Sequence, residues 1–120
     1  DSLVLVPADP SISALDLAGW LAEVGRRYHR ASVEVVDATS LGVKDLDALL
    51  PEIAALARRG GRALIAVPPP LTHHDAVPIA RAADAALLLA RLGTTRISTA
   101  RETIECVGSG SFIGSLALHS

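Results

Sequence analysis

The sequence predicts an open, doubly wound α/β domain in three layers, with a mostly parallel five-stranded sheet between helices on both faces. Three observations lead to this fold class. The 120 residues are enough for one domain, residues 1–120, but too few for two. Half of the residues are apolar and aromatic side chains are nearly absent, which suits helices packed closely on a parallel sheet. Short apolar runs rich in β-branched residues alternate with segments of helical periodicity.

The first three elements are a strand, a helix and a second strand. Residues 2–8 form a continuous apolar run, typical of a strand that is buried on both faces. Apolar residues recur at helical spacing over residues 14–27, and Ser11 or Ser13 is available as the N-cap, so a helix is predicted there. Residues 32–38 have the β-branched content of a second strand.

The middle of the chain predicts a helix and a third strand. Apolar residues over 46–57 form one helical stripe, which ends at the two glycines of residues 60–61. Pro51 inside this stripe predicts a kink, or a helix that begins there. Residues 62–70 predict a strand that its own prolines bring to an end.

The last part of the chain completes the alternation. A short helix is predicted over residues 75–83. Residues 85–93 are assigned to a strand because the alternation requires one, although their alanines and leucines favour a helix. Residues 98–108 predict a helix that is capped by its first or second residue, and residues 111–120 a final strand.

Ligands of such a sheet are expected beyond the carboxyl ends of its strands. Right-handed crossovers with helices on both faces bring the loops after the strands to one edge. In this chain the loops are residues 7–13, 37–44, 68–75 and 91–98. Candidate binding residues should therefore lie in these four segments.

Charge and hydropathy exclude several classes of protein. The formal net charge is −2 and no basic run occurs, which disfavours nucleic-acid binding. Asp84 and Arg91 interrupt the longest apolar stretch, residues 82–93, which falls short of the ~20 residues that a membrane span needs. No signal peptide is recognised at the start, and the single Cys106 fits a reducing compartment. The expected location is the cytoplasm, and no direct membrane insertion is expected.

The second half of the chain carries a recognisable pattern: Pro68-Pro69, then Asp75-Ala76, then Asp84 at the start of a strand, then the loop of residues 91–96, Arg-Leu-Gly-Thr-Thr-Arg. This spacing resembles the P-loop ATPase domain of the bacterial tyrosine kinases of capsule and exopolysaccharide synthesis (BY-kinases), relatives of the MinD/ParA ATPases. The helix after residue 11 and the strand ending at Asp37 are similar to the first half of that family. The resemblance implies a Rossmann-like P-loop fold.

The chain departs from this family where phosphates would be held. A P-loop uses glycines to converge backbone N–H groups on the phosphates and a lysine to reach the β and γ oxygens. The loop of residues 7–13 has neither, and Lys44, the chain's only lysine, lies beyond the second strand. The family's aspartate before Pro-Pro falls at Ala66. We therefore expect a degenerate domain with no catalytic residue, cofactor or metal, and with Asp9, Ser11, Ser13 and Asp37 as the remnant of the nucleotide loop.

A second group of candidates could contact a ligand or a partner: Pro68, Pro69, His73, His74, Asp75, Thr94 and Arg96. The His-His-Asp run is favoured as a loop that caps a helix over a metal site, because adjacent side chains diverge. The serines of the first loop are favoured as N-caps over nucleophiles. Asp37 is either a relict metal residue or an acceptor for loop N–H groups, and the sequence leaves both open.

The expected function is a non-catalytic adaptor or regulator in bacterial polysaccharide synthesis or export. By the resemblance, its partner is the cytoplasmic segment of a membrane-anchored polysaccharide co-polymerase, which would bring it to the inner membrane, or another copy in a homo-oligomer. The alternative is a flavodoxin-like domain or enzyme that binds a small ligand or phosphate at the helix N-termini near Ser11, Asp75 and Ser98. An exposed apolar face favours the adaptor, and a closed cleft with convergent donors favours the ligand site.

Overall fold

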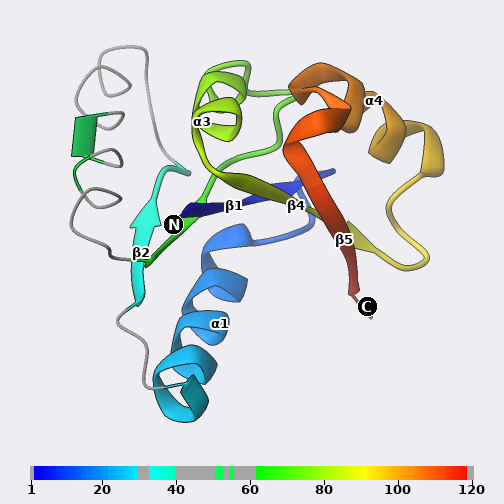
Figure 1. The fold of residues 1–120 in the computed structure, drawn as a ribbon. Helices are drawn as coiled ribbons and strands as arrows, with labels where there is room; N and C mark the ends of the chain where they lie inside the picture. The colour runs from blue at the N-terminus through cyan, green and yellow to red at the C-terminus, as the bar shows by residue number, and fades with distance from the viewer. Residues whose placement is uncertain (1, 30–32, 40–50, 53–54, 56–61, 119–120) are drawn as a thin grey trace.

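Five strands form one parallel sheet in the order β2-β3-β1-β4-β5 (Figure 1). The structure is a computed structural model that describes residues 2–29, 33–39, 51–52, 55 and 62–118. The strands are β1 (Ser2–Pro7), β2 (Val33–Asp37), β3 (Arg62–Ala66), β4 (Ala85–Arg91) and β5 (Phe112–Leu118). The described helices are α1 (Ala14–His29), α3 (Ala76–Ala82) and α4 (Ile97–Val107), with a 3-10 turn, η1 (Ser109–Ser111), before β5.

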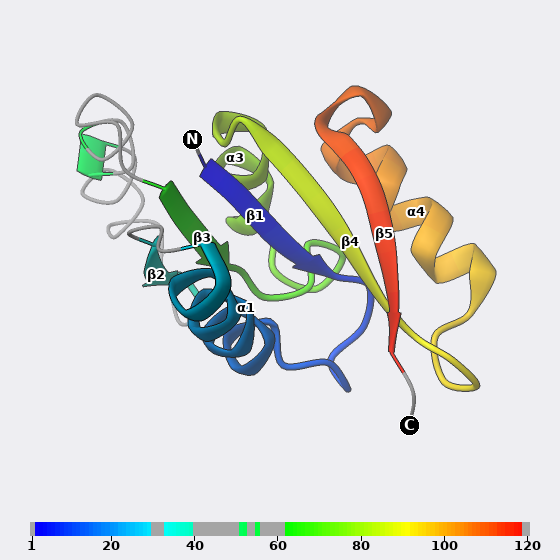
Figure 2. The same cartoon turned by 60° about the horizontal axis from the view of Figure 1, so that its bottom comes forward.

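The helices lie on both faces of the sheet, which confirms the predicted three-layer α/β fold. Helix α1 covers one face, and α3 and α4 lie on the other (Figures 1 and 2). The chain leaves β1 through α1 toward β2, whereas α3 and α4 carry it in the opposite direction across the sheet. The direction therefore reverses between β1 and β4, which is where doubly wound sheets bind their ligands.

The alternation of side chains along each strand builds a separate core on each face. On the side of α3 and α4, the fully buried members of the core include Val4, Val6, Ile65, Ile79 and Val107. On the side of α1, the buried members are Leu5, Ile12, Ala14, Ala18, Ala66 and Leu89. Alanines one turn apart on the inner side of α1 let this helix approach the sheet closely, because they add little bulk between backbone and strand.

Residues 85–93 have the propensity of a helix, whereas the alternation of strands and helices along the chain predicts a strand there. This segment forms β4 over Ala85–Arg91, between β1 and β5 in the sheet. Ala86, Leu88 and Leu89 of this central strand are buried, so its alanines and leucines are stabilised by packing rather than by strand propensity. The prediction of a strand here is confirmed.

Several boundaries differ from the prediction, among them the end of α1 at His29, the end of β4 at Arg91, the end of β3 and the start of α4. Strand β3 ends at Ala66 instead of continuing to Pro70, because proline has no N–H for the sheet ladder. Helix α4 begins at Ile97 with Arg96 at the N-cap position, so a cap at residue 98 or 99 is wrong. The predicted helix over residues 46–57 lies outside the described residues, apart from residues 51–52 and 55, which are helical.

Candidate functional site

The loop after β1 and the loop after β4 meet where the chain direction reverses. Asp9 lies two residues beyond β1, and Thr95 lies in the loop between β4 and α4. The Thr95 hydroxyl donates a short hydrogen bond to Oδ2 of Asp9. The two loops are thus joined at the position where ligands bind in folds of this type.

The other oxygen of the Asp9 carboxylate is bonded within its own loop. Oδ1 of Asp9 accepts from the Ser11 backbone N–H, with an N–O distance of 2.9 Å, and from the Ser11 hydroxyl through a short bond. Arg91, the last residue of β4, donates from Nη2 to the Ser11 carbonyl over 3.1 Å. We call Asp9, Ser11, Arg91 and Thr95 the Asp9 cluster, because these hydrogen bonds join the four residues.

A tight turn after β4 holds Thr95 in reach of Asp9. The backbone N–H groups of Thr94 and Thr95 both donate to the Arg91 carbonyl, over 3.1 and 2.9 Å. Gly93 supplies the turn with a positive φ of 81°, a conformation that side chains disfavour. The Thr95 hydroxyl accepts from the Arg91 backbone N–H over 2.8 Å and is left with its proton for Asp9.

These contacts keep Asp9 ionised. Partial burial is the largest single influence and acts to raise the pKa of the Asp9 carboxyl. The hydrogen bonds from the Ser11 and Thr95 side chains, the Ser11 N–H and the charge of Arg91 act in the opposite direction and together outweigh burial, so the pKa is lowered from its ordinary value. A negative charge therefore stands at neutral pH in the loop after β1.

The backbone of the first loop offers few donors to an anion. Pro7 and Pro10 have no N–H group. The Ala8 N–H donates to the Leu89 carbonyl over 2.9 Å, and the N–H of Ile12 donates to the Asp9 carbonyl over 3.4 Å. Since the Ser11 N–H is also taken by Asp9, these groups cannot converge on a phosphate as they do in a P-loop.

The two remaining predicted residues of the first group have local structural contacts. Asp37, at the end of β2, accepts from the Thr39 N–H over 3.0 Å and from the Thr39 hydroxyl. These bonds lower the pKa of Asp37 against the opposing effect of burial. Ser13 accepts from the Asp16 N–H over 3.2 Å and so acts as the N-cap of α1. Asp37 thus has the contacts of an acceptor for loop N–H groups.

The predicted loop after β3 forms a turn of its own. The N–H groups of Thr72 and His73 donate to the Pro69 carbonyl, over 3.2 and 2.9 Å, and the Thr72 hydroxyl lies 3.0 Å from Nδ1 of His73. Both histidines are exposed. Asp75 occupies the N-cap position of α3, but its side chain makes no capping hydrogen bond. Within the described residues, no group of three His, Cys, Asp or Glu could hold a metal ion.

The residues that complete the Asp9 cluster were not among the predicted candidates. Thr94 and Arg96 were chosen from the loop after β4, yet both are exposed, and the contacts are made by Thr95, which lies between them, and by Arg91 at the end of β4. The sequence pattern of residues 91–96 already marked this loop as a candidate. Deciding which of its residues contacts Asp9 requires knowing that β4 lies beside β1 in the sheet. Nε of Arg91 is buried and has no hydrogen-bond partner among the described residues.

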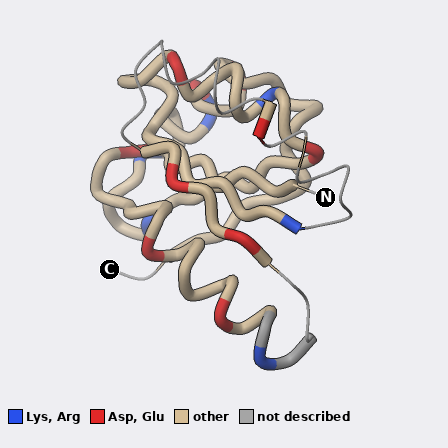
Figure 3. The backbone as a smooth tube through the Cα atoms, turned by 90° about the vertical axis from the view of Figure 1, so that its left-hand side faces the viewer, with Lys and Arg blue, Asp and Glu red and all other residues tan. Residues whose placement is uncertain are grey.

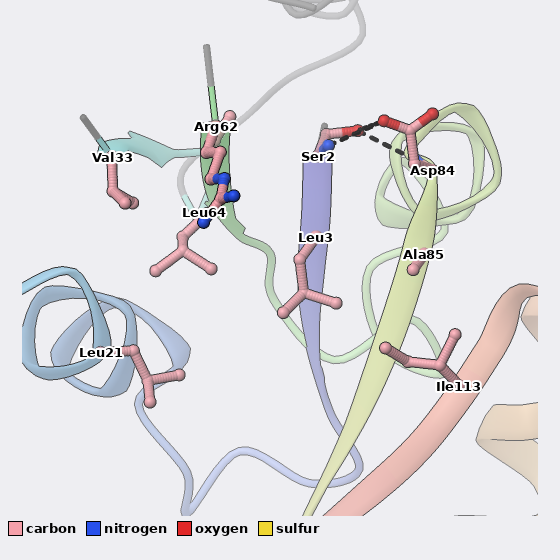
Figure 4. A pocket seen from close by; sticks show the side chains of 10 residues that line it. Ser2, Leu3, Leu21, Val33, Arg62, Leu64, Asp84, Ala85 and Ile113 are labelled. Carbon is pink, nitrogen blue, oxygen red and sulfur yellow. Dashed lines mark hydrogen bonds between the residues drawn. The ribbon is translucent and has the colours of Figure 1, made fainter. Parts of the chain in front are cut away.

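A hollow lies at the end of the sheet opposite to the Asp9 cluster, on the face that carries α1. Its volume is about 490 Å³, and Leu3, Leu21, Leu64 and Ile113 point into it (Figure 4). Arg62 and Asp84 stand at the amino ends of β3 and β4 beside it, in the same view. Apart from these two side chains and Ser2 its walls are apolar, and no sequence motif predicted it.

The comparisons with known proteins assign no family, because no protein-family model matches the sequence and no curated protein matches it. None of the described helices is both long and apolar enough to cross a membrane. Acidic and basic positions are dispersed along the described backbone and do not gather on one face (Figure 3). The similarity to BY-kinases therefore remains a prediction from the sequence.

Proposed function

We propose that this domain is a pseudo-ATPase: a non-catalytic docking domain that keeps the architecture of a nucleotide-binding fold without binding nucleotide. The observation that carries the proposal is that the Asp9 carboxylate accepts the hydrogen bonds of Ser11 and Thr95 in the loops after β1 and β4. Ser11 and Thr95 donate hydrogen bonds to this carboxylate, so the loops stabilise the charge of Asp9 instead of the charge of a ligand.

Electrostatics support the absence of phosphoryl transfer. That reaction depends on positioned cations and a metal that neutralise the charge of the transferred group. Asp9 is ionised at neutral pH and would repel a triphosphate. Arg91 is the only cation of the Asp9 cluster, and its Nη2 is bonded to the Ser11 carbonyl. Ala66 and Val67 stand where β3 ends beside β1 and offer no carboxylate for Mg²⁺.

Protein partners are the class of ligand that the apolar surface of this domain favours. The apolar hollow on the α1 face is a surface that a protein can cover, whereas Asp9, Ser11 and Thr95 at the polar edge are already hydrogen-bonded to one another. A role in bacterial polysaccharide synthesis or export, in the cytoplasm at the inner membrane, rests on the resemblance to BY-kinases. By that resemblance the partner is a polysaccharide co-polymerase segment or another copy of this chain.

Calorimetric titration of the purified chain with MgATP and MgADP, with thermal unfolding in parallel, tests the proposal. A functional site would raise the free energy of unfolding by ~2.7 kcal/mol at a hundredfold excess of ligand over Kd. We expect no heat of binding and no thermal shift. Saturable Mg²⁺-dependent binding would refute the proposal. Asp9→Asn is the matched variant, since it removes the charge and keeps the shape; weak binding gained by this variant alone would identify the carboxylate as the excluding group.

One observation favours a second candidate function, the binding of a small anion at the same edge. Nε of Arg91 is buried without a partner among the described residues, and it lies where the chain direction reverses. An oxyanion such as phosphate could accept from it. Titration with inorganic phosphate distinguishes the two functions: saturable binding that Arg91→Gln abolishes would favour the anion site, and no binding would favour the docking domain.

A further inference from the structure

The sheet face that carries α1 is covered over only part of its width. Neighbouring strands lie about 4.8 Å apart, so the outer strands of a five-stranded sheet are separated by about 19 Å, and a helix covers about 10 Å. Each face therefore needs two helices. The other face has α3 and α4, whereas α1 packs against β1, β2 and β3. Leu89 of β4 is fully buried on this face with Ile12 and Ala14, so the carboxyl ends of these strands are covered. At the amino ends of β4 and β5, no described element covers the α1 side.

The uncovered area is hollowed and apolar. Leu21 of α1 forms one wall, Leu3 and Leu64 form the roof, and Ile113 of β5 forms the other wall, as Figure 4 shows. Ile113 is 72% exposed, although it lies in a strand of a parallel sheet. We call this hollow of about 490 Å³ the α1-side groove.

Helix α1 carries an apolar side chain that no described residue covers. Trp20 is 62% exposed and immediately precedes Leu21, which lines the groove. Leu17 and Leu21, three residues before and one residue after Trp20, pack against the core on this face of the sheet, so Trp20 stands at the outer edge of the apolar side of α1. An exposed tryptophan at such an edge is expected where a helix packs against a second element.

We propose that a second copy of the chain covers this face, in a two-fold dimer in which Trp20 of each copy enters the α1-side groove of the other. A two-fold interface uses the same patch on both partners, so it needs a protruding group and a complementary hollow side by side. Trp20 and the groove meet this requirement. The α1 helix of the second copy would also supply a second helix on this face, where the described part of the chain has only α1.

The charges around the two parts are compatible with this pairing. Glu23 and Arg27 stand beside Trp20 on α1 and form an exposed ion pair, with an N–O distance of 3.9 Å. At the groove, Arg62 and Asp84 likewise supply one charge of each sign. Each rim is therefore neutral in sum, so the pairing brings no net like charge together.

This inference rests on the proposed function, of which it names the partner and the surface. Tryptophan is the residue type most often responsible for binding energy at interfaces, and it buries roughly 150–250 Å² when covered. Two such anchors, related by symmetry, account for a substantial part of an interface of standard size.

The single tryptophan of the chain reports directly on the interface. Sedimentation equilibrium and Trp fluorescence of the 120-residue chain are measured over the same concentration series. The proposal predicts a dimer whose formation coincides with a blue shift of the emission and with protection from iodide quenching. A chain that stays monomeric up to high micromolar concentrations overturns the proposal, and so does a dimer in which Trp20 remains accessible to iodide.

Two variants separate the anchor from the groove. Trp20→Ala removes the anchor and Ile113→Lys places a charge in the groove; both residues are exposed, so both chains should fold. Each change should weaken dimerisation at least about thirtyfold, the effect of removing an interface hot spot. Ile97→Lys is the control, because Ile97 is 80% exposed but belongs to α4 on the other face; it should leave dimerisation unchanged. An equal loss in the control would overturn the proposal.

Mixing the two variants gives a result that non-specific association cannot produce. Each variant alone has lost both symmetric contacts, whereas a mixed dimer restores one, since the intact Trp20 of the Ile113→Lys chain can enter the intact groove of the Trp20→Ala chain. Mass-tagged chains should therefore form mixed dimers in preference to either pure dimer. Absence of this preference overturns the proposed contact. Nucleotide titration is independent of this result, so failure of the dimer and failure of the pseudo-ATPase proposal are distinguishable.

Discussion

The two ends of the sheet differ in how far they satisfy their own groups. At the carboxyl end, Asp9 accepts from Ser11 and Thr95, and Arg91 is held by the Ser11 carbonyl. At the amino end on the α1 side, apolar groups surround a hollow that no described element fills. The edge where the fold usually binds ligands is thus the closed one, and the open one is apolar.

This difference indicates where free energy of binding is available. A ligand that takes the donors of Ser11 or Thr95 at the carboxyl end must replace hydrogen bonds that already exist, so its net gain is small. A partner at the α1-side groove removes apolar surface from water, which contributes about 25 cal/mol for each Å². The architecture of a ligand-binding sheet therefore does not by itself identify the binding edge.

The largest effect is expected from one substitution made on the two faces. Ile79→Ala empties a site that is fully buried between α3 and the sheet and should cost about 2–5 kcal/mol of unfolding free energy. Ile113→Ala, in the α1-side groove, should cost within about 0.5 kcal/mol when the chain is dilute enough to be monomeric. Urea denaturation measures both. Equal costs would mean that another part of the chain covers Ile113.

A smaller effect is expected from opening the Asp9 cluster. Asp9→Ala leaves the Ser11 N–H and the Thr95 hydroxyl without their acceptor and should lower the unfolding free energy by about 2 kcal/mol, because hydrogen bonds to charged groups are the stronger ones. Glu102→Ala, which removes an exposed carboxylate from α4, should change it by less than about 0.5 kcal/mol. If the two variants unfold at the same denaturant concentration, the cluster contributes no stability.

The turn that positions Thr95 should respond next. Gly93→Ala places a side chain at a φ of 81° and should cost about 1 kcal/mol through the backbone alone, since nothing lies within 4 Å of the new Cβ position. Gly110→Ala also meets no neighbour within 4 Å but has no positive φ, so it should cost less. Thermal unfolding compares them; a Gly110 variant that is as destabilised as the Gly93 variant would contradict the assigned role of the turn.

The smallest effect is expected on the pH dependence of the unfolding free energy in acid. Because the pKa values of Asp9 and Asp37 are lowered in the folded chain, the unfolded chain takes up protons first as the pH falls. Their contribution to stability is complete above the ordinary aspartate pKa of about 3.9 and is lost as the pH falls through the lower folded values. Asp9→Asn should flatten this loss in urea titrations between neutral pH and pH ~2. If the unfolding free energy of the variant falls with pH as steeply as that of the unchanged chain, other carboxylates cause the loss of stability in acid.

The apolar runs and the helical spacing of apolar residues predicted the strands and the described helices, because both patterns reflect which side chains a single element buries. The strand at residues 85–91 was assigned by alternation against the helical propensity of its alanines and leucines. The Asp9 cluster was predicted in part: Asp9 and Ser11 were named, but Thr95 and Arg91 were not. Their role depends on the order of strands in the sheet, which no local pattern encodes.

The α1-side groove could not be predicted for a similar reason. Leu3, Leu64 and Ile113 read as ordinary buried strand residues, since the sequence does not indicate which strands a helix will cover. Trp20 gave the available signal, because it widens the apolar stripe of α1 beyond what one sheet face needs. Burial on one face is a property of the assembled layers, not of a single segment.

The most direct test of the central claim is a titration of the ¹⁵N-labelled chain with MgATP, monitored through amide resonances. The account predicts no saturable shift at Ser11, Ile12, Thr94 or Thr95, since their N–H groups are already bonded within the two loops. Saturable shifts at these amides, with release of the Thr95 hydroxyl from Asp9, would contradict it, because the closed edge would then be a nucleotide site.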